Sequence, residues 1–297
     1  MHSLRKDKQK NAAEKLAEYL DDKLKPNVGY PDAPTWGYAF TALFGHSLGG
    51  HELLKEKALK FLFAQDIESN EFSWEFVIFC LSYLINDSAE GIPSQFQKNH
   101  EKGTRMFNWF LLRCHNRLQF KQNGIFNNFK LNTGLYLYQQ QDGLILDEFR
   151  TRSLHYHAFC LFVIAHILKF NNSKFLRKVF ENGISIAKTY ILRDGTSLYI
   201  GRGQEQIFGY GSLVYALEYY NSNMLPLGDD CLDLITDKIV GFQRENGSFP
   251  LILRKCDIED ENVTFRNDAP SGWHGYNTLY DYLPFLGYCL SESSKLK

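Results

Sequence analysis

The sequence has no surplus of charge of either sign. Its 297 residues include 33 Lys and Arg against 34 Asp and Glu, which gives a formal net charge of −1. Binding to phosphate backbones or to anionic membranes draws on a net positive field, and this chain has none. We therefore expect neither nucleic acid nor a membrane as its partner.

Long apolar runs are absent as well. The apolar blocks at 76–85 and 158–167 are short and contain polar residues, whereas a helix that spans a bilayer needs about 20 apolar residues. The chain begins with MHSLRKDKQKNAAEKLAEYL, which lacks the apolar core of a signal peptide. The sequence therefore predicts a cytoplasmic protein.

Cysteine and histidine spacing excludes two further classes. No two cysteines form a C-x-x-C pair, and no two histidines have the H-x-x-x-H spacing of a zinc helix. The cysteines stand in apolar helical contexts, which are typical of buried free thiols. We therefore expect no disulfide framework, no metal and no cofactor. The six cysteines are Cys80, Cys114, Cys160, Cys231, Cys256 and Cys289.

Aromatic residues are what the chain has in excess. The 17 tyrosines and 24 phenylalanines together outnumber the 33 Lys and Arg. Such a chain can bury a large apolar area, which argues against disorder. A buried tyrosine hydroxyl needs a hydrogen-bond partner, so a core alone would use fewer tyrosines. This composition points to a tyrosine-lined groove.

Apolar residues recur at helical spacing along the chain, as in Leu16, Tyr19 and Leu20. Asp-Gly and Asn-Gly turns separate these segments, and short β-leaning runs follow two of the turns, at 197–200 and 248–253. The helices are predicted at 10–24, 36–48, 51–65, 72–86, 101–119, 127–140, 151–170, 173–192, 204–221, 227–243 and 272–292.

Helical hairpins in this number favour an all-α fold, an (α/α)5-6 toroid. We expect an incomplete barrel of helical hairpins with short β-hairpin-like loops, in one domain over 1–297. A stacked superhelix is the competing architecture, but the sequence shows no fixed-period repeat of the tetratricopeptide or armadillo kind.

Five polar and aromatic stretches are candidates for a functional site. In 30–38, Tyr30 and Trp36 form either a packed entry segment or a sugar-stacking wall. In 127–132, the paired asparagines form either a helix cap or an amide, at Asn128, that points into a groove.

The stretch 142–157 gathers arginines, histidines and carboxylates around Tyr156. His155 and His157 are two residues apart, so they point to different faces of a helix and would not share a metal. Tyr156 and the histidines are therefore candidates for proton transfer, with a buried hydrogen-bonded pair as the alternative. Arg150 and Arg152 are candidates for binding an anionic substrate.

The last two stretches are rich in glycine. The stretch 201–211 does not follow a phosphate-loop pattern, so its glycines are expected to bring the backbone close to a ligand. The stretch 270–277 suits carbohydrate stacking, or else packs in the last helix of the ring. The candidate binding residues of the two stretches are Arg202, Gln204, Gln206, Tyr210, Trp273, His274 and Tyr276.

The third stretch resembles a known motif. Its pattern is similar to the D-G-x-x-x-E-R-S-x-x-Y-H segment of the heparinase II/III-like and alginate-lyase-like polysaccharide lyases. The residues that carry the resemblance are Asp142, Gly143, Glu148, Ser153, Tyr156 and His157. Upstream, 127–132 resembles the N-N-H-x-x-x-N segment of these families, while 73–75 and 105–109 resemble their W-E and R-x-x-N-W helices. The motifs follow the same order over residues 70–170.

This resemblance implies an α/α toroid and β-elimination at a uronic acid, in an acidic polysaccharide or oligosaccharide. Asn128 would neutralise the uronate carboxylate, and Tyr156 would be the catalytic base or acid. The histidine of the family motif is Phe129 here, so His155, His157 or His274 would have to accept the proton, unless Tyr156 acts alone. No C-terminal β-sandwich, which many relatives have, is expected.

Two other functions fit the same residues. A glycoside hydrolase on this scaffold would need two carboxylates beside the scissile bond. The candidates are Asp142, Asp147, Glu148, Glu205 and Asp268. A non-catalytic protein that binds acidic glycans or assembles a capsule is the third possibility, because Phe129 replaces the family histidine. The oligomeric state does not follow from the sequence.

Overall fold

The computed structural model describes residues 2–69, 72–122, 124–228, 230–254 and 279–296. Within these ranges the chain forms eleven α-helices and one short 3₁₀ helix, η1 (Ser94–Gln97). The α-helices are α1 (His2–Lys23), α2 (Gly37–Leu48), α3 (Glu52–Ala64), α4 (Trp74–Asp87), α5 (Phe107–Gln119), α6 (Gly124–Tyr138), α7 (Leu154–Leu168), α8 (Lys174–Thr189), α9 (Ile207–Asn223), α10 (Cys231–Val240) and α11 (Leu279–Lys295).

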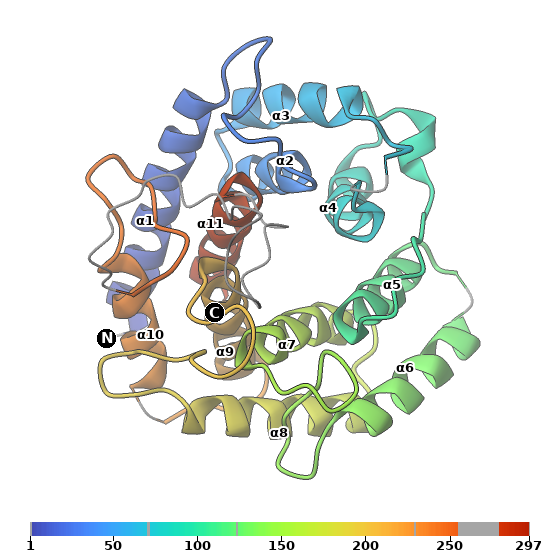
Figure 1. Cartoon of the computed structure of the whole chain (residues 1–297), viewed down its shortest axis with the longest axis vertical. Helices are drawn as coiled ribbons and strands as arrows, with labels where there is room; N and C mark the ends of the chain where they lie inside the picture. The colour runs from blue at the N-terminus through green and yellow to red at the C-terminus, as the bar shows by residue number, and fades with distance from the viewer. Residues whose placement is uncertain (1, 70–71, 123, 229, 255–278, 297) are drawn as a thin grey trace, which may run out of the picture.

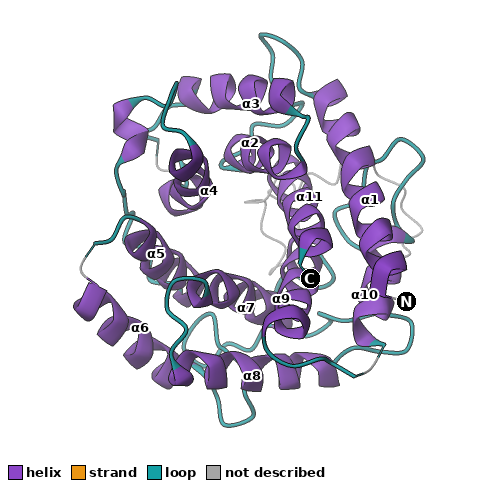
Figure 2. Cartoon of the chain, turned by 180° about the vertical axis from the view of Figure 1, so that it is seen from behind, coloured by secondary structure: helices purple, strands orange, loops and turns teal. Residues whose placement is uncertain are grey.

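The helices form two concentric rings (Figures 1 and 2). The inner ring consists of α2, α4, α5, α7, α9 and α11, each of which contacts the next, and α11 closes the ring against α2. The outer ring consists of α1, α3, α6, α8 and α10. Between α4 and α5 the chain forms only η1, so no outer α-helix stands there. The predicted α/α toroid is therefore confirmed.

The eleven predicted helical segments correspond one to one with α1–α11, with ends that differ by a few residues for most. The β-leaning runs do not form strands in the described residues. The run 248–253 contributes one isolated bridge, between Ile252 and Gln206, and another joins Gln139 to Ile145. The loops between helices are therefore held by single bridges and turns.

Aromatic side chains fill the axis of the inner ring. The ring centre of Phe208 lies 4.4 Å from that of Phe285 and 4.7 Å from that of Phe159. Trp36 stacks on Phe76 at 4.9 Å. All five side chains are buried, so the axis is a packed core and not a pore. Much of the aromatic excess in the sequence is used here.

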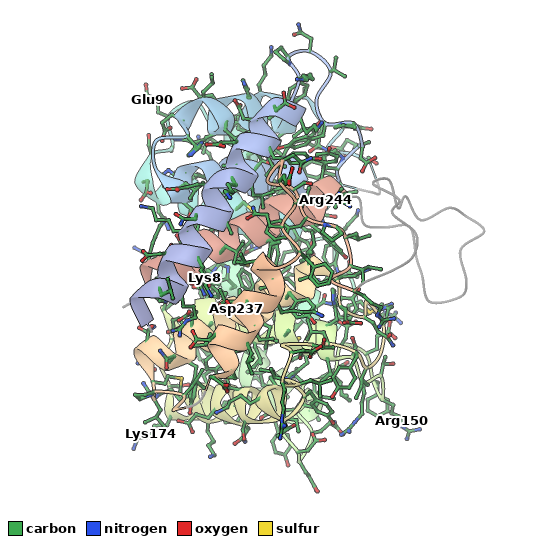
Figure 3. The ribbon with its side chains drawn as sticks, turned by 90° about the vertical axis from the view of Figure 1, so that its left-hand side faces the viewer. Lys8, Glu90, Arg150, Lys174, Asp237 and Arg244 are labelled. Carbon is green, nitrogen blue, oxygen red and sulfur yellow. The ribbon has the colours of Figure 1, made fainter. Side chains whose placement is uncertain are left out.

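The inner helices begin at the same end of the ring. Asp281, at the start of α11, accepts a hydrogen bond from the backbone N–H of Gly37, at the start of α2, at 2.7 Å. Similarly, the N–H of Phe107, at the start of α5, donates to Asp147 O just ahead of α7, at 2.9 Å. We call this end the N-terminal face. The loop that carries Arg150 lies on it (Figure 3).

Two sequence-based expectations concern the interior and the membrane. The five cysteines within the described residues are buried free thiols, as expected, and Cys256 lies outside those residues. None of the described helices combines the length and the apolar character that a membrane span requires.

Candidate functional site

Four buried carboxylates lie on the N-terminal face, each in the first turn of an inner helix or in the loop before it. They are Glu75, Asp147, Glu205 and Asp281, and none is more than 3% exposed. The positive end of a helix dipole favours negative charge there. A buried carboxylate is still costly unless it is hydrogen-bonded or paired, so the partners of each one reveal what it does.

Asp281 is a cap for a neighbouring helix. Its two carboxylate oxygens accept hydrogen bonds from the backbone N–H groups of Thr35, Trp36 and Gly37, at 3.2, 2.9 and 2.7 Å. Burial raises the pKa of Asp281 to about 6, while these hydrogen bonds act in the opposite direction. This carboxylate satisfies the open N–H groups at the start of α2 and joins α11 to it.

Glu75 and Glu205 hold loops in place. Glu75 Oε1 accepts hydrogen bonds from the N–H of Lys102 at 2.9 Å and from Arg113 at 3.2 Å. The side chain of Glu205 is paired with Arg254, whose Nε donates to Oε2 at 2.5 Å. Each carboxylate therefore anchors a loop: Glu75 the one that carries Lys102, and Glu205 the one that carries Arg254.

Asp147 has a different environment. The amide of Asn108 donates to Oδ1 at 2.5 Å, and Arg202 Nη2 donates to Oδ2 at 2.9 Å. Burial raises the pKa of Asp147 to about 6; the charge of Arg202 opposes this shift and that of Glu148 adds to it. Asp147 therefore exchanges its proton close to neutral pH, as an acid–base catalyst must.

Arg202 joins Asp147 to Tyr156. The guanidinium carbon of Arg202 lies 4.7 Å from the centre of the Tyr156 ring, within the range of a cation–π contact. The Arg202 side chain is 26% exposed, whereas that of Asp147 is 1% exposed. An incoming anion would therefore meet Arg202 before it meets Asp147.

Ser153 places these groups side by side. As the N-cap of α7, its hydroxyl oxygen accepts a hydrogen bond from the N–H of Tyr156 at 3.4 Å and donates one to Arg202 O at 2.9 Å. The N–H of Leu154 also donates to Ile200 O at 3.0 Å. The start of α7 and the loop before α9 are thus fastened together by one capping residue.

The glycines at 201 and 203 allow this close approach. A Cβ on Gly201 would lie 2.4 Å from Arg152 O, and one on Gly203 would lie 2.9 Å from His155 Cγ. The glycine-rich stretch therefore packs on the start of α7. The expectation that its glycines approach a ligand is corrected at these two positions, because Arg152 and Ser153, just before α7, and the side chain of His155 occupy that space.

His155 lies next to Gly203, close enough to Arg202 to be affected by its charge. It is fully buried, and its ring packs against those of Tyr156 and Phe208. Burial and, to a smaller extent, the charge of Arg202 together lower its pKa to about 3. The imidazole is therefore neutral at physiological pH. We call Asn108, Asp147, His155, Tyr156 and Arg202 the mouth cluster.

Asn128 lies elsewhere. It is on α6, a helix of the outer ring, and its Oδ1 accepts a hydrogen bond from the amide of Asn171 at 2.9 Å. The neighbouring Asn127 is the buried one, and its amide donates to Cys114 O. The structure does not bring Asn128 to Tyr156, so the implied pairing of these two residues in one site is corrected.

His157 is also placed away from reacting groups. Its Nδ1 accepts a hydrogen bond from the N–H of Ile145 at 3.0 Å, and Nε2 lies 3.0 Å from Gly183 O. Burial lowers its pKa to about 4. Both nitrogens are occupied by the backbone, so the imidazole fastens α7 to the loop before it and to α8, in line with the alternative of a buried hydrogen-bonded residue.

Three aromatic candidates are core residues. Tyr30 is 4% exposed and its hydroxyl pairs with Thr41. Trp36 is equally buried against Phe76. The hydroxyl of Tyr210 donates to Ser197 O. A sugar cannot stack on rings that the core covers, so the predicted wall at Tyr30 and Trp36 is corrected to a packed entry segment.

The remaining polar candidates surround the mouth cluster. Arg152 is half exposed and pairs with Asp142 at 2.5 Å, and Arg150 is exposed beside the ring of Phe149. Gln204 is exposed, whereas Gln206 is buried at the start of α9. The candidates that lie outside the described residues are Trp273, His274 and Tyr276.

Asn108 was not predicted as a site residue, and Asp147 was only one of several acids considered for a glycoside hydrolase. Asn108 stands inside the R-x-x-N-W segment, and Asp147 follows the apolar run Leu144–Leu146. An acid directly after three apolar residues is a sign that the backbone enters the core at that point.

Within the described residues, no three His, Cys, Asp or Glu side chains are grouped as metal ligands.

No protein-family model matches the chain, and no curated protein matches it by sequence. Solved structures match it in fold. A glycosyl hydrolase family 88 protein from Bacteroides vulgatus has a TM-score of 0.62 at 11% identity, over 96% of this chain and 98% of its own.

An unsaturated glucuronyl hydrolase from Streptococcus agalactiae, in complex with dGlcA-GalNAc6S, has a TM-score of 0.61 at 13% identity, over 96% and 91% of the two chains. A polysaccharide lyase has a TM-score of 0.60 at 10% identity, over 96% and 97%. At these identities the likeness concerns the fold. The chain thus has the α/α-toroid fold that carbohydrate-active enzymes, both hydrolases and a lyase, share.

Proposed function

We propose that this chain is an enzyme that cleaves a glycosidic bond next to an anionic sugar, with Asp147 as the acid that donates a proton. The observation that carries the proposal is the hydrogen bond between the buried carboxyl group of Asp147 and the partly exposed guanidinium of Arg202, which also lies over Tyr156. The pKa of Asp147, raised to about 6 by burial, is consistent with this role. A catalytic acid works best when its pKa lies near the working pH. The hydrolases among the structural neighbours support this reading.

Arg202 supports an anionic substrate. A guanidinium binds a carboxylate through paired hydrogen bonds, and this one is partly exposed. A sugar carboxylate that binds Arg202 would compete with Asp147 for its hydrogen bonds. Since the charge of Arg202 lowers the pKa of Asp147, the loss of this pairing raises that pKa. Substrate binding would thereby release Asp147 from Arg202 and keep its carboxyl group protonated.

Hydrolysis also requires a second carboxylate that activates water or attacks the sugar. Glu148 is the nearest candidate, because it follows Asp147 in the chain, is only partly buried and acts electrostatically on Asp147. Asp142 is the second candidate, but it is engaged with Arg152. We assign the role to Glu148.

A second reaction, β-elimination, is favoured by one observation. The guanidinium of Arg202 lies over the ring of Tyr156, and a nearby cation stabilises a phenolate. Tyr156 would then remove the proton next to the uronate carboxylate while Arg202 neutralises that carboxylate. We rank elimination below hydrolysis because of Asn128. The resemblance implies that its amide neutralises the uronate carboxylate, but Asn128 lies on the outer ring and not in the mouth cluster.

Product analysis tests the proposal. The chain would be incubated with a panel of oligosaccharides that end in saturated or unsaturated uronates, with neutral mannan oligosaccharides as controls. Hydrolysis releases reducing ends without a new double bond, while elimination creates a double bond that absorbs ultraviolet light. We expect reducing ends from the anionic sugars alone, without a new double bond. Cleavage of neutral sugars only, or binding without cleavage, would contradict the proposal.

A further inference from the structure

The outward face of α6 is unusually apolar. Its exposed large side chains are Ile125, Phe126, Phe129, Tyr136 and Leu137, which are 62–86% exposed. At the helical repeat they lie within about 120° of the helix circumference, so they form one stripe. Figures 1 and 2 place α6 at the outer edge of the ring. We call these five residues the α6 stripe.

Charge sets α6 apart from the other outer helices. Lys130 is the single charged residue of the helix, and it lies at the edge of the stripe. In contrast, α3 and α8 each carry five charged residues, and the shorter α10 carries three. Apolar surface in a contiguous stripe with little charge is typical of a protein interface.

We propose that the α6 stripe is a dimer interface, and that its occupant is the α6 stripe of a second copy of this chain. The area is sufficient. Taking roughly 200 Å² for a large side chain, the five residues expose on the order of 700 Å² per copy, close to the ~800 Å² that each partner contributes to a standard interface. Interfaces between identical subunits are also the more apolar ones.

The order of residues in the stripe is self-complementary. Two copies of α6 packed antiparallel around a twofold axis near residue 131 would place Ile125 against the partner's Leu137. The same axis would place Phe126 against the partner's Tyr136. Phe129 would face the partner's Thr133, a smaller exposed residue that leaves room for the ring. A twofold axis pairs each patch with itself, as this arrangement requires. Lys130 at the edge can direct its ammonium group into water.

Sedimentation velocity of the full-length chain tests this proposal. The wild type is expected to be a dimer at micromolar concentration. The double substitution Phe126→Glu/Phe129→Glu is expected to weaken dimerisation at least ~100-fold, with an unchanged helical circular dichroism spectrum. Leu53→Glu, at an exposed position of α3, is the matched control and keeps the dimer.

Three results would overturn the proposal: a monomeric wild type, a double variant that still dimerises, or a monomer that binds lipid vesicles through the same residues. A second test does not depend on charge insertion. The variant Phe129→Cys/Thr133→Cys is expected to form disulfide-linked dimers under mild oxidation, while the wild type remains unlinked. Absence of linked dimers from the variant would count against the antiparallel pairing.

Discussion

Arg202 holds its guanidinium carbon 4.7 Å from the centre of the Tyr156 ring. The same guanidinium donates a hydrogen bond to Asp147 at 2.9 Å. One side chain thus contacts the acid of the proposed hydrolysis and the phenol of the alternative elimination. Substitutions at these three residues therefore separate the two reactions.

Arg202→Ala should change both substrate binding and the pH profile. Without the guanidinium, the pKa of Asp147 rises above about 6, because the opposing charge is lost. We expect KM for the anionic substrate to increase at least about 10-fold, and the pKa that Asp147 contributes to the kcat/KM profile to move to higher pH. Arg152→Ala, which removes an exposed arginine paired with Asp142, should move neither by a comparable amount.

Tyr156→Phe distinguishes hydrolysis from elimination. The change removes one hydroxyl and keeps the ring that Arg202 covers. If Asp147 donates the proton, kcat should fall less than about 10-fold. If Tyr156 moves the proton, kcat should fall at least about 100-fold. Steady-state kinetics on the substrate found in the product screen would measure this, and the larger loss would favour elimination.

Asp281→Ala should destabilise the fold. The substitution leaves the buried N–H groups at the start of α2 without their acceptor. We expect the free energy of unfolding to fall by about 2–4 kcal/mol, as measured by urea denaturation. Asp230→Ala is the control, since Asp230 is exposed before α10 and makes no side-chain cap; it should change the stability by less than about 0.5 kcal/mol. Equal effects of the two substitutions would refute the capping role.

Acid should destabilise the protein through its buried histidines. Burial lowers the pKa of His115 and His157 to about 4 and that of His155 to about 3, and it places that of His166 well below its usual value. An unfolded imidazole binds its proton near pH 6.5, so the stability that these groups contribute is present above pH 6.5 and is lost as pH falls toward 4.

Two buried carboxyl groups act in the opposite direction. Because the pKa values of Asp147 and Asp281 are raised to about 6, both groups bind protons at a higher pH in the folded state than in the unfolded state. Near pH 5 the unfolded chain should therefore bind on the order of two protons more than the folded chain. Urea denaturation at several pH values measures this. His157→Gln should reduce the difference by about one proton; an unchanged slope would contradict the assignment.

The helices were predictable because their signal is local. Periodic apolar residues and Asp-Gly or Asn-Gly turns define each segment, and both are read from neighbours in sequence. The ring position of a helix is not local. Asn128 was expected in the groove because the family resemblance implied it, yet α6 belongs to the outer ring. Which of two successive helices faces the axis depends on contacts with helices that are distant in the sequence.

The site was predictable in part. Tyr156 and Arg202 were selected from two separate stretches, and a hydrogen bond through Ser153 joins those stretches. Asp147 was one of several candidate acids, and although the apolar run before it indicates entry into the core, the sequence does not show which partners it meets there. Its pKa is raised by burial, and its partner Arg202, which opposes that shift, is 55 residues away along the chain, so only the fold reveals this environment.

The most direct test of the central claim is the activity of Asp147→Asn on the anionic substrate, compared with that of Asp230→Asn, at an exposed acid before α10. The asparagine keeps the size of the carboxyl group and removes its exchangeable acidic proton. Because its amide would face a donor of Asn108 or Arg202, we expect a lower stability in a chain that still folds. We predict that kcat/KM falls at least about 100-fold for Asp147→Asn, while Asp230→Asn stays within about 10-fold of the wild type. Full activity in a folded Asp147→Asn variant would contradict the account.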